Sequence, residues 1–376
     1  MVAASATLLV LVWQSITVRF NYEGNWSALY SVGNLWPLPP ELSGEKIFVF
    51  RNAGYDGGFY HLVAHDPWLA RGFSKYVDNP SLRWRRILVP AMAYLAAFGA
   101  DERVHACYIG INLLFIFAGA FWLASYCEFH ALKPVWGLAF LAIPSVLVSI
   151  DRLTVDTALA SLTIGLILYA CKGKYVRSLA LLALCPLARE TGLLLTAGRA
   201  WEQASNREWR RVALSLASMI PFLLWCFFLF RNAPQDDTHW FAPPFAGILQ
   251  RTLHPLQAPI TGRWVALAAC LDYLALVGIW IALAFAARFA LKRRFGLLES
   301  CIYTCSFAVL WLGKADIWNG AYEFGRTLSP LLILWGLQAV RLRNFWLLTP
   351  LGCALPRIFL QYEPQIRGIG RHILHH

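Results

Sequence analysis

The chain has 376 residues, of which 58% are hydrophobic and only 14% are charged. Soluble domains carry about 25% charged residues, so this composition excludes an ordinary soluble protein and indicates that lipid is the solvent for much of the surface. The formal net charge is +12. Nucleic-acid binding is excluded nonetheless, because the basic residues form short clusters between apolar runs, as the positive-inside rule produces, and not a basic face on a soluble fold.

Apolar runs in chain order predict an all-α, polytopic transmembrane helical bundle. The first run, Val2–Val18, has almost no basic region and no small-residue cleavage site followed by a polar domain. We interpret it as a retained membrane helix and not as a signal peptide. A spanning helix needs about 20 mostly apolar residues. Eight further runs are predicted to span, namely His105–Tyr126, Pro134–Ile150, Leu153–Cys171, Val212–Phe230, Trp264–Ala287, Leu297–Gly313, Leu328–Val340 and Phe345–Leu360.

Two other apolar segments are less regular. Ile87–Ala100 is short for a span, and Ser178–Gly198 is interrupted by Pro186, Arg189 and Glu190. Proline breaks a helix because it removes a backbone donor. An ionisable pair at membrane depth must face protein or water.

Charge in the loops decides the topology. The four basic loops share one side, assigned as cytoplasmic, only if Ser178–Gly198 is a pair of half-helices that returns to its starting side. Ile87–Ala100 is then interfacial or re-entrant. These rules predict about 10–11 membrane segments in one domain, 1–376, with extracytoplasmic loops at 19–86, 231–263 and 314–325. The basic loops are Lys172–Arg177, Arg207–Arg211, Arg288–Arg294 and Arg341–Arg343.

The first outer loop, 19–86, is long, is expected to carry short interfacial helices, and contains an acid flanked by glycines. The run is Gly54-Tyr55-Asp56-Gly57-Gly58, and such glycines permit a tight turn and close approach of another backbone or a ligand. Arg83, Arg85 and Arg86 follow, against the positive-inside bias. Guanidinium groups bind phosphate with paired hydrogen bonds, although snorkelling to lipid headgroups explains them equally well.

Further charged residues are predicted on the same outer side. Asp151 and Asp156 bracket the start of one span, where a helix cap or an ion pair of Asp156 with Arg152 is the structural alternative. Arg189-Glu190 lies in the broken segment, and Glu323 and Arg326 enter a helix near the end of the chain. Each has a structural explanation of its own, but their convergence on one face favours a shared polar site.

A metal site is a weaker hypothesis from the same loop. His61 and His65 are four residues apart and share a helical face, so Asp56 or Asp66 would complete a ligand set. A divalent cation, Mg²⁺ or Mn²⁺, held by carboxylates and a phosphate is a second form of it, although no cofactor is required by the sequence. Cys301 and Cys305 lack further ligands and are interpreted as small buried hydrophobes.

Taken together, the run Gly54–Asp66, the acids Asp151 and Asp156, and the segment Ala188–Gly192 resemble the GT-C superfamily of polytopic glycosyltransferases. The likeness covers roughly the first two hundred residues, with 201–376 as additional helices. Ala188–Gly192 is similar to the Leu-Thr-Lys-Glu type motif of such enzymes, with Arg189 in place of lysine. The chain departs from the protein O-mannosyltransferase branch, because it has no large lumenal domain. It also lacks the tryptophan-rich signature of oligosaccharyltransferases.

The resemblance implies roles for particular residues. Asp56 would be the first-loop catalytic acid, acting as general base or holding a metal, and Asp151 or Asp156 would be the second acid. The arginines would bind phosphate. The remaining residues expected to contact substrate are Tyr55, His61, Arg83, Arg85, Arg86, Arg189, Glu190, Glu323 and Arg326.

The expected function is therefore transfer of a sugar from a polyprenyl-phosphate donor to an acceptor hydroxyl of a glycan, lipid or protein, with inversion implied by the family. The expected location is a bacterial inner membrane, with the site facing the periplasm or the outside, since the chain is small and has no added domains. The alternative is a transporter or flippase of a lipid-linked anion, which would also place arginines and acids in a membrane cavity. Inverted repeats typical of transporters are not apparent.

Overall fold

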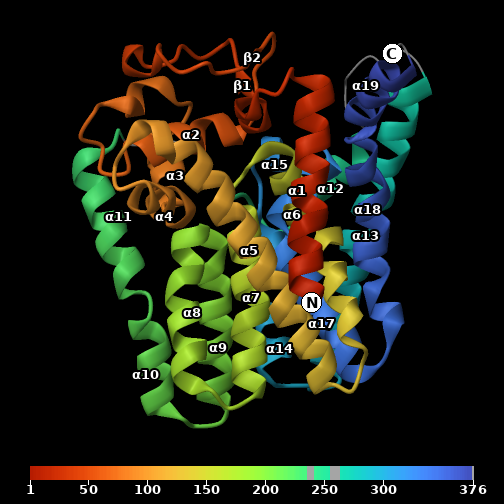
Figure 1. The fold of residues 1–376 in the computed structure, drawn as a ribbon. Coiled ribbons are helices and arrows are strands. Elements are labelled where there is room, and N and C mark those ends of the chain that lie inside the picture. The colour runs from red at the N-terminus through yellow and green to blue at the C-terminus, as the bar shows by residue number, and fades with distance from the viewer. Residues whose placement is uncertain (235–240, 255–262, 375–376) are drawn as a thin grey trace.

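The computed structural model describes residues 1–234, 241–254 and 263–374, and in these ranges the protein is mostly helical, with almost no strand (Figure 1). The only sheet in the described chain joins two short parallel strands, β1 (Val32–Gly33) and β2 (Val49–Phe50), with Val32 opposite Val49. The all-α prediction is therefore confirmed.

Four helical stretches are long and apolar enough to cross a membrane, and five if one bent pair counts as a single span. The bent pair is η4 (Pro134–Ala142) and α6 (Pro144–Arg152), which meet at 63°. The four stretches are α1 (Val2–Asn21), α5 (Asp101–Phe129), α10 with α11 (Trp209–Ala217 and Ile220–Asn232) and α13 (Arg263–Leu291).

The other expected spans are present as shorter apolar helices. A helix of 14 residues, the length of α17, rises about 21 Å, which is less than the ~30 Å hydrocarbon layer. Length and composition therefore give four or five candidate spans among the described residues. The shorter helices are α7 (Asp156–Cys171), α8 (Tyr175–Ala188), α14 (Leu297–Trp311), α17 (Ser329–Leu342) and η6 with α18 (Phe345–Leu348 and Thr349–Leu360).

The first loop folds into short helices at the upper end of Figure 1. The last of them, α4, has nine residues, so the expectation that Ile87–Ala100 is too short to span is confirmed. The elements of the loop are η1 (Trp26–Tyr30), η2 (Pro40–Leu42), α2 (Asp56–His65), η3 (Phe73–Tyr76), α3 (Pro80–Arg85) and α4 (Leu88–Ala96).

The predicted break in Ser178–Gly198 is also confirmed. Helix α8 ends at Ala188, Arg189 is extended, and after η5 (Glu190–Gly192) the chain continues as α9 (Leu193–Ser205). Gly192 allows this turn, because a Cβ there would lie 2.4 Å from the backbone carbon of Cys185. In Figure 1, α8 and α9 lie side by side and both join their outer neighbours, α7 and α10, at the lower end.

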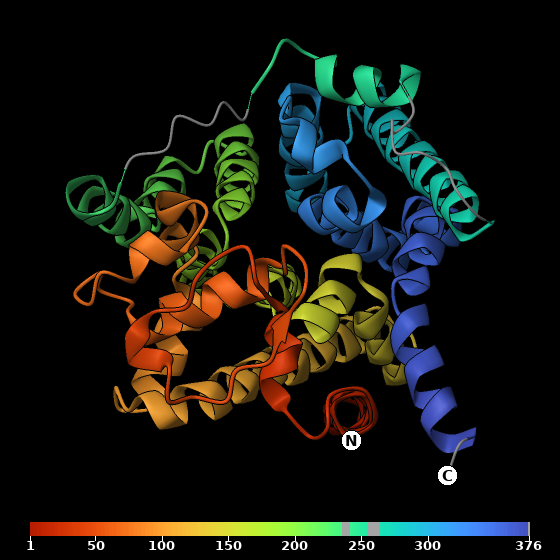
Figure 2. The same cartoon turned by 90° about the horizontal axis from the view of Figure 1, so that it is seen from above.

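The remaining elements complete the upper part of the molecule. They are α12 (Ala246–Leu253), α15 (Ala315–Trp318), α16 (Ala321–Thr327) and α19 (Glu363–Leu374). From above, the first loop and the helices of the last third lie on either side of the yellow segment around α6 (Figure 2). The expected outer loop 231–263 lies partly outside the described residues.

Candidate functional site

The glycines around Asp56 hold the start of α2 against two other segments. Gly54 has a φ of +71°, and a Cβ on it would lie 2.3 Å from the nitrogen of Gly33. A Cβ on Gly57 would lie 2.0 Å from the carbonyl oxygen of Arg152. The predicted tight turn and close backbone approach are thus both present. Asp56 becomes the first residue of α2, where the helix dipole favours a negative charge.

Asp56 is joined to arginines from two distant parts of the chain. Its Oδ1 lies 2.9 Å from Nη2 of Arg83, and its Oδ2 lies 2.7 Å from Nη2 of Arg326. Arg83 also forms two hydrogen bonds, of 2.8 and 2.6 Å, with Asp78 at the edge of the loop. The first loop and α16 therefore meet at this carboxylate.

Asp156 receives the next pair of arginines. It is the first residue of α7 and is buried. Nη1 of Arg189 donates to its Oδ1, and Nε of Arg326 lies 3.7 Å from its Oδ2. Arg189 also donates to the hydroxyl of Thr327 over 3.1 Å. The break after α8 thus brings Arg189 into the same cluster as Arg326.

Arg86 and Tyr60 close the cluster into a ring. Arg86 donates to both carboxylate oxygens of Glu190, at 2.9 and 2.6 Å. Its Nη1 donates to the hydroxyl of Tyr60 at 2.7 Å, and Nη1 of Arg83 lies 3.5 Å from the same hydroxyl. Glu190 in turn lies 4.0 Å from Nε of Arg189. We call this set the arginine–carboxylate ring, and its members are Asp56, Tyr60, Arg83, Arg86, Asp156, Arg189, Glu190 and Arg326.

Several donors and acceptors of the ring are buried but unsatisfied. Within the described residues, Nε of Arg189, Nε and Nη1 of Arg326, and Oδ2 of Asp156 have no hydrogen-bond partner. An unsatisfied buried polar atom costs about 1–3 kcal/mol, and more when it is charged. Asp156, Arg189 and Arg326 also line a narrow crevice together with Leu159, Pro330 and Ile333. Charged and apolar side chains therefore meet in this crevice.

The ring sets the protonation of Asp56. Burial opposes ionisation of this carboxyl, but Arg83 and Arg326 outweigh it and hold the pKa of Asp56 well below its usual range. Asp56 is therefore a carboxylate at neutral pH. A carboxylate held by two guanidinium groups is a weak base, and it would become a stronger one if an anion drew those arginines away.

The electrostatic cost of the ring argues against a purely stabilising role. Each buried charge loses several kcal/mol of hydration, and buried ion pairs are often no more stabilising than packed apolar side chains. Four guanidinium groups and three carboxylates meet here with side chains at most 25% exposed. Such clusters of shifted and partly unsatisfied groups are typical of functional sites.

Two further predicted residues border the ring. The Tyr55 ring lies under the guanidinium of Arg326, with 5.2 Å between the guanidinium carbon and the ring centre. Tyr55 also lines a small cleft inside the first loop, together with Trp36, Phe59 and Tyr76. Glu323, on α16, is half-buried; burial raises its pKa although Arg326 is close.

Asp151 and Arg85 were also predicted site residues, but both lie apart from the ring. Asp151 is buried in a separate cluster, where Arg152 and the hydroxyl of Tyr322 bind its Oδ2 at 2.9 and 2.7 Å. The alternative pair of Arg152 with Asp156 is not formed in the described chain, since Arg152 bonds to Asp151 and to Ser31. Arg85 is half-buried near Cys226 of α11, and no ion pair of it is found among the described residues.

The predicted metal ligands separate into three places. Asp56 belongs to the ring, and Asp66 accepts backbone hydrogen bonds from Ala70, Arg71 and Phe73, which makes it a turn-forming residue. His61 and His65 do come together, with 3.1 Å between their Nε2 atoms. His61 therefore contacts His65 and not the ring.

Sequence reasoning missed Tyr60, Asp78 and Thr327. Tyr60 was detectable in principle, because it lies four residues after Asp56 and so shares its helical face. Asp78 and Thr327 carried no such signal, since their contacts depend on the tertiary structure. No family model, curated protein or solved structure matches this chain.

Proposed function

We propose that this chain is an integral membrane glycosyltransferase of the GT-C type, which transfers a sugar from a polyprenyl phosphate to an acceptor hydroxyl. The observation that supports the proposal best is that N–H groups of Arg189 and Arg326 lack a hydrogen-bond partner among the described residues, close to the half-buried Asp56. Guanidinium groups that line the same crevice suit a phosphate. Leu159, Pro330 and Ile333 line the same narrow crevice and suit the start of a polyprenyl chain, although the crevice would have to widen to admit it.

The proposed orientation follows from the positions of the loops. The turns from α7 to α8 and from α9 to α10, both basic, lie at the lower end of Figure 1. Arg343 of a third basic loop donates to the carbonyl of His130 after α5, and Arg341 binds Glu299 at the start of α14. We assign this end to the cytoplasm of a bacterial cell and the first loop to the periplasm or the outside. The shorter apolar helices would then be half-spans and broken spans, giving the 10–11 segments of the proposed topology.

The chemistry divides between charge stabilisation and proton removal. A sugar phosphate already carries a good leaving group, so the arginines need only neutralise the negative charge that develops on it. The acceptor hydroxyl must lose a proton, which a carboxylate within hydrogen-bond reach accepts. Binding of the donor phosphate by Arg326 would loosen its hold on Asp56 and raise the pKa of that carboxyl. In this scheme donor binding activates the base.

Mg²⁺ or Mn²⁺ fits this ring poorly. Asp56 and Asp156 are each already engaged by two arginines, and a further cation beside four guanidinium groups would be repelled. The donor set of the ring therefore favours catalysis in which arginines replace the metal.

A pair of neighbouring arginines gives a direct test. Arg86 belongs to the ring and Arg85 does not. With purified protein and radiolabelled polyprenyl-phosphate sugars, Arg86→Gln should raise the KM for the donor at least about tenfold, because it removes a positive charge from the ring and leaves Glu190 free to compete for Arg189. Arg85→Gln should leave it within about twofold. Equal effects of the two substitutions, or movement of intact donor across vesicles without release of polyprenyl phosphate, would refute the transferase and favour the transporter.

A further inference from the structure

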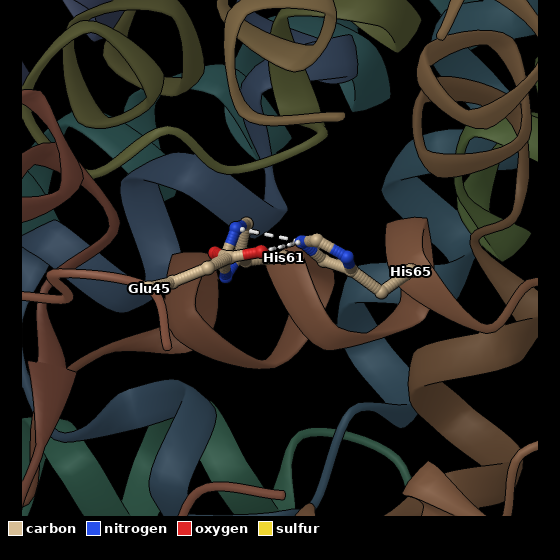
Figure 3. Close-up of side chains that lie close together, drawn as sticks. All are labelled: Glu45, His61 and His65. Atoms are coloured by element: carbon tan, nitrogen blue, oxygen red, sulfur yellow. Dashed lines mark hydrogen bonds and ion pairs between the residues drawn. The ribbon is translucent and has the colours of Figure 1, made fainter. Parts of the chain in front are cut away.

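Glu45, His61 and His65 form a second polar cluster, separate from the arginine–carboxylate ring. The three side chains point toward one another from the segment after η2 and from two turns of α2 (Figure 3). Both histidines are fully buried, and one ligand atom from each of the three residues lies within 4.8 Å of the others. Three donors of this type at this spacing meet the first requirement of a metal site.

The distances fit an ion between the two imidazoles. The Nε2 atoms are 3.1 Å apart. An ion about 2.05 Å from each nitrogen would therefore have an N–metal–N angle of roughly 100°. Oε1 of Glu45 lies 3.9 Å from Nε2 of His65, whereas tetrahedral ligands of such an ion are about 3.4 Å apart. A shift of the Glu45 side chain by about half an ångström would complete three sides of a tetrahedron.

Asp101 orients His65 as a carboxylate usually orients a histidine that binds a metal. Nδ1 of His65 lies 2.7 Å from Oδ1 of Asp101, and Nη1 of Arg71 holds the same oxygen at 2.7 Å. Asp101 therefore accepts the Nδ1 proton, which leaves Nε2 of the neutral ring as a lone pair directed at His61. A carboxylate–histidine pair of this kind fixes the tautomer and raises the basicity of the ligand.

A plain hydrogen bond between the histidines explains less of the geometry. It accounts for the 3.1 Å contact, but it leaves Oε1 of Glu45 buried beside the pair with no hydrogen-bond partner among the described residues. A buried carboxylate oxygen that receives no hydrogen bond is costly. An ion at the cluster would satisfy this oxygen and both Nε2 atoms at once.

We propose that Glu45, His61 and His65 bind one Zn²⁺ ion, with a water as fourth ligand. Two imidazoles and one carboxylate favour zinc over Mg²⁺ or Ca²⁺, which prefer oxygen ligands. His61 is five residues beyond Asp56 along α2, a rise of about 7.5 Å, so the ion would not contact Asp56. Such an ion would tie the 43–47 segment to α2 and thereby hold the helix that begins with Asp56.

The test uses full-length protein stripped of metal with a chelator. His372, His375 and His376 are changed to glutamine in every sample, because a terminal histidine tract binds zinc by itself; the last two lie outside the described residues. Zinc titration followed by atomic emission should give one ion per chain and a higher Tm. Co²⁺ in the same site should show the visible absorption of a tetrahedral ion.

Three variants separate this site from adventitious binding. His61→Gln should abolish the stoichiometric ion, Glu45→Gln should weaken it at least tenfold, and Asp101→Asn should weaken it about 10–100-fold through His65. His130→Gln, a half-buried histidine away from the cluster, should bind zinc as the parent does. Zinc binding that survives both His61→Gln and Glu45→Gln, or zinc that leaves the parent Tm unchanged, would overturn the proposal. Glu45 lies in an irregular segment and is half-buried, so its substitution should not prevent folding. Glu45→Gln therefore tests the site even if His61→Gln does not fold.

Discussion

Arg86 donates two hydrogen bonds to Glu190, 104 residues later in the chain, with lengths of 2.9 and 2.6 Å. This bidentate ion pair connects the end of α3 to the break between α8 and α9. The guanidinium is almost completely buried and the carboxylate is 25% exposed. A pair of this kind contributes geometric specificity, but it gives little net stability compared with well-packed apolar side chains.

Removing one partner of the pair should therefore cost more than removing both. Arg86→Met leaves Glu190 without its main cation and should lower the free energy of unfolding by about 3–5 kcal/mol. The double variant Arg86→Met, Glu190→Gln should recover most of that loss while remaining inactive. Denaturant titration of the purified protein in detergent, as a double-mutant cycle, measures the coupling.

An exposed pair serves as the control for this cycle. Arg211 and Glu208 are three residues apart on the protein surface, with side chains 51% and 37% exposed. Arg211→Met should produce no measurable change in stability, because exposed ion pairs are screened by water and salt. A double variant of the buried pair that is destabilised by the full sum of its single variants would contradict the expected coupling.

Asp56→Asn should abolish sugar transfer and leave the protein folded. Arg83 keeps its bonds to Asp78, and Arg326 keeps Asp156 nearby, so neither arginine loses every anionic neighbour. Loss of a general base reduces turnover by about 10²–10⁴-fold. The matched control is Asp316→Asn, which changes an acid that is 75% exposed and outside the ring. Turnover of Asp56→Asn within a few-fold of the parent would remove Asp56 from the mechanism.

Asp56 should also make stability depend on pH. Its pKa in the folded protein is depressed by Arg83 and Arg326 against the opposing effect of burial. A depressed pKa means that the contribution of Asp56 is fully present above the unfolded value, near 3.9. That contribution falls away as the pH drops below about 4. The Tm of the parent should therefore decline more steeply between pH 5 and 3 than that of Asp56→Asn, and parallel curves would contradict this prediction.

The three arginines of the first loop show what the sequence could predict about the site. Their residue type and outer position pointed to an anion site, but the sequence did not decide which of them converge. Arg83, Arg85 and Arg86 lie on α3 or at its end. Successive helical residues are rotated by about 100°, so residues three apart share a face and the middle one turns away. Recognising that short helix would have separated Arg85 from the other two.

Asp151 and Asp156 show a limit of the same reasoning. Both were expected at the site, but α6 ends at Arg152, Leu153 takes a φ of 43°, and α7 begins at Asp156. The turn directs the two acids to different clusters. Glu45 shows another limit: the spacing of His61 and His65 predicted their contact, whereas nothing local in the sequence pointed to an acid 16 residues earlier. Tertiary contacts between loops carry no periodic signal.

The close approach of α2 to α6 gives a test that does not change any charge. A Cβ on Gly57 would lie 2.0 Å from the carbonyl oxygen of Arg152 and 2.8 Å from that of Tyr30. Alanine in a helix normally gains about 0.5–1 kcal/mol over glycine, but a clash with backbone costs about 1–3 kcal/mol, so the clash should win. Gly57→Ala should lower the Tm and displace the start of α2, and with it Asp56, from Arg326.

Gly110→Ala is the matched control, because Gly110 lies within α5 and a Cβ there would meet nothing within 4 Å. Equal Tm values for the two variants would show that α2 does not depend on this approach, and normal sugar transfer by Gly57→Ala would show that the ring tolerates its displacement.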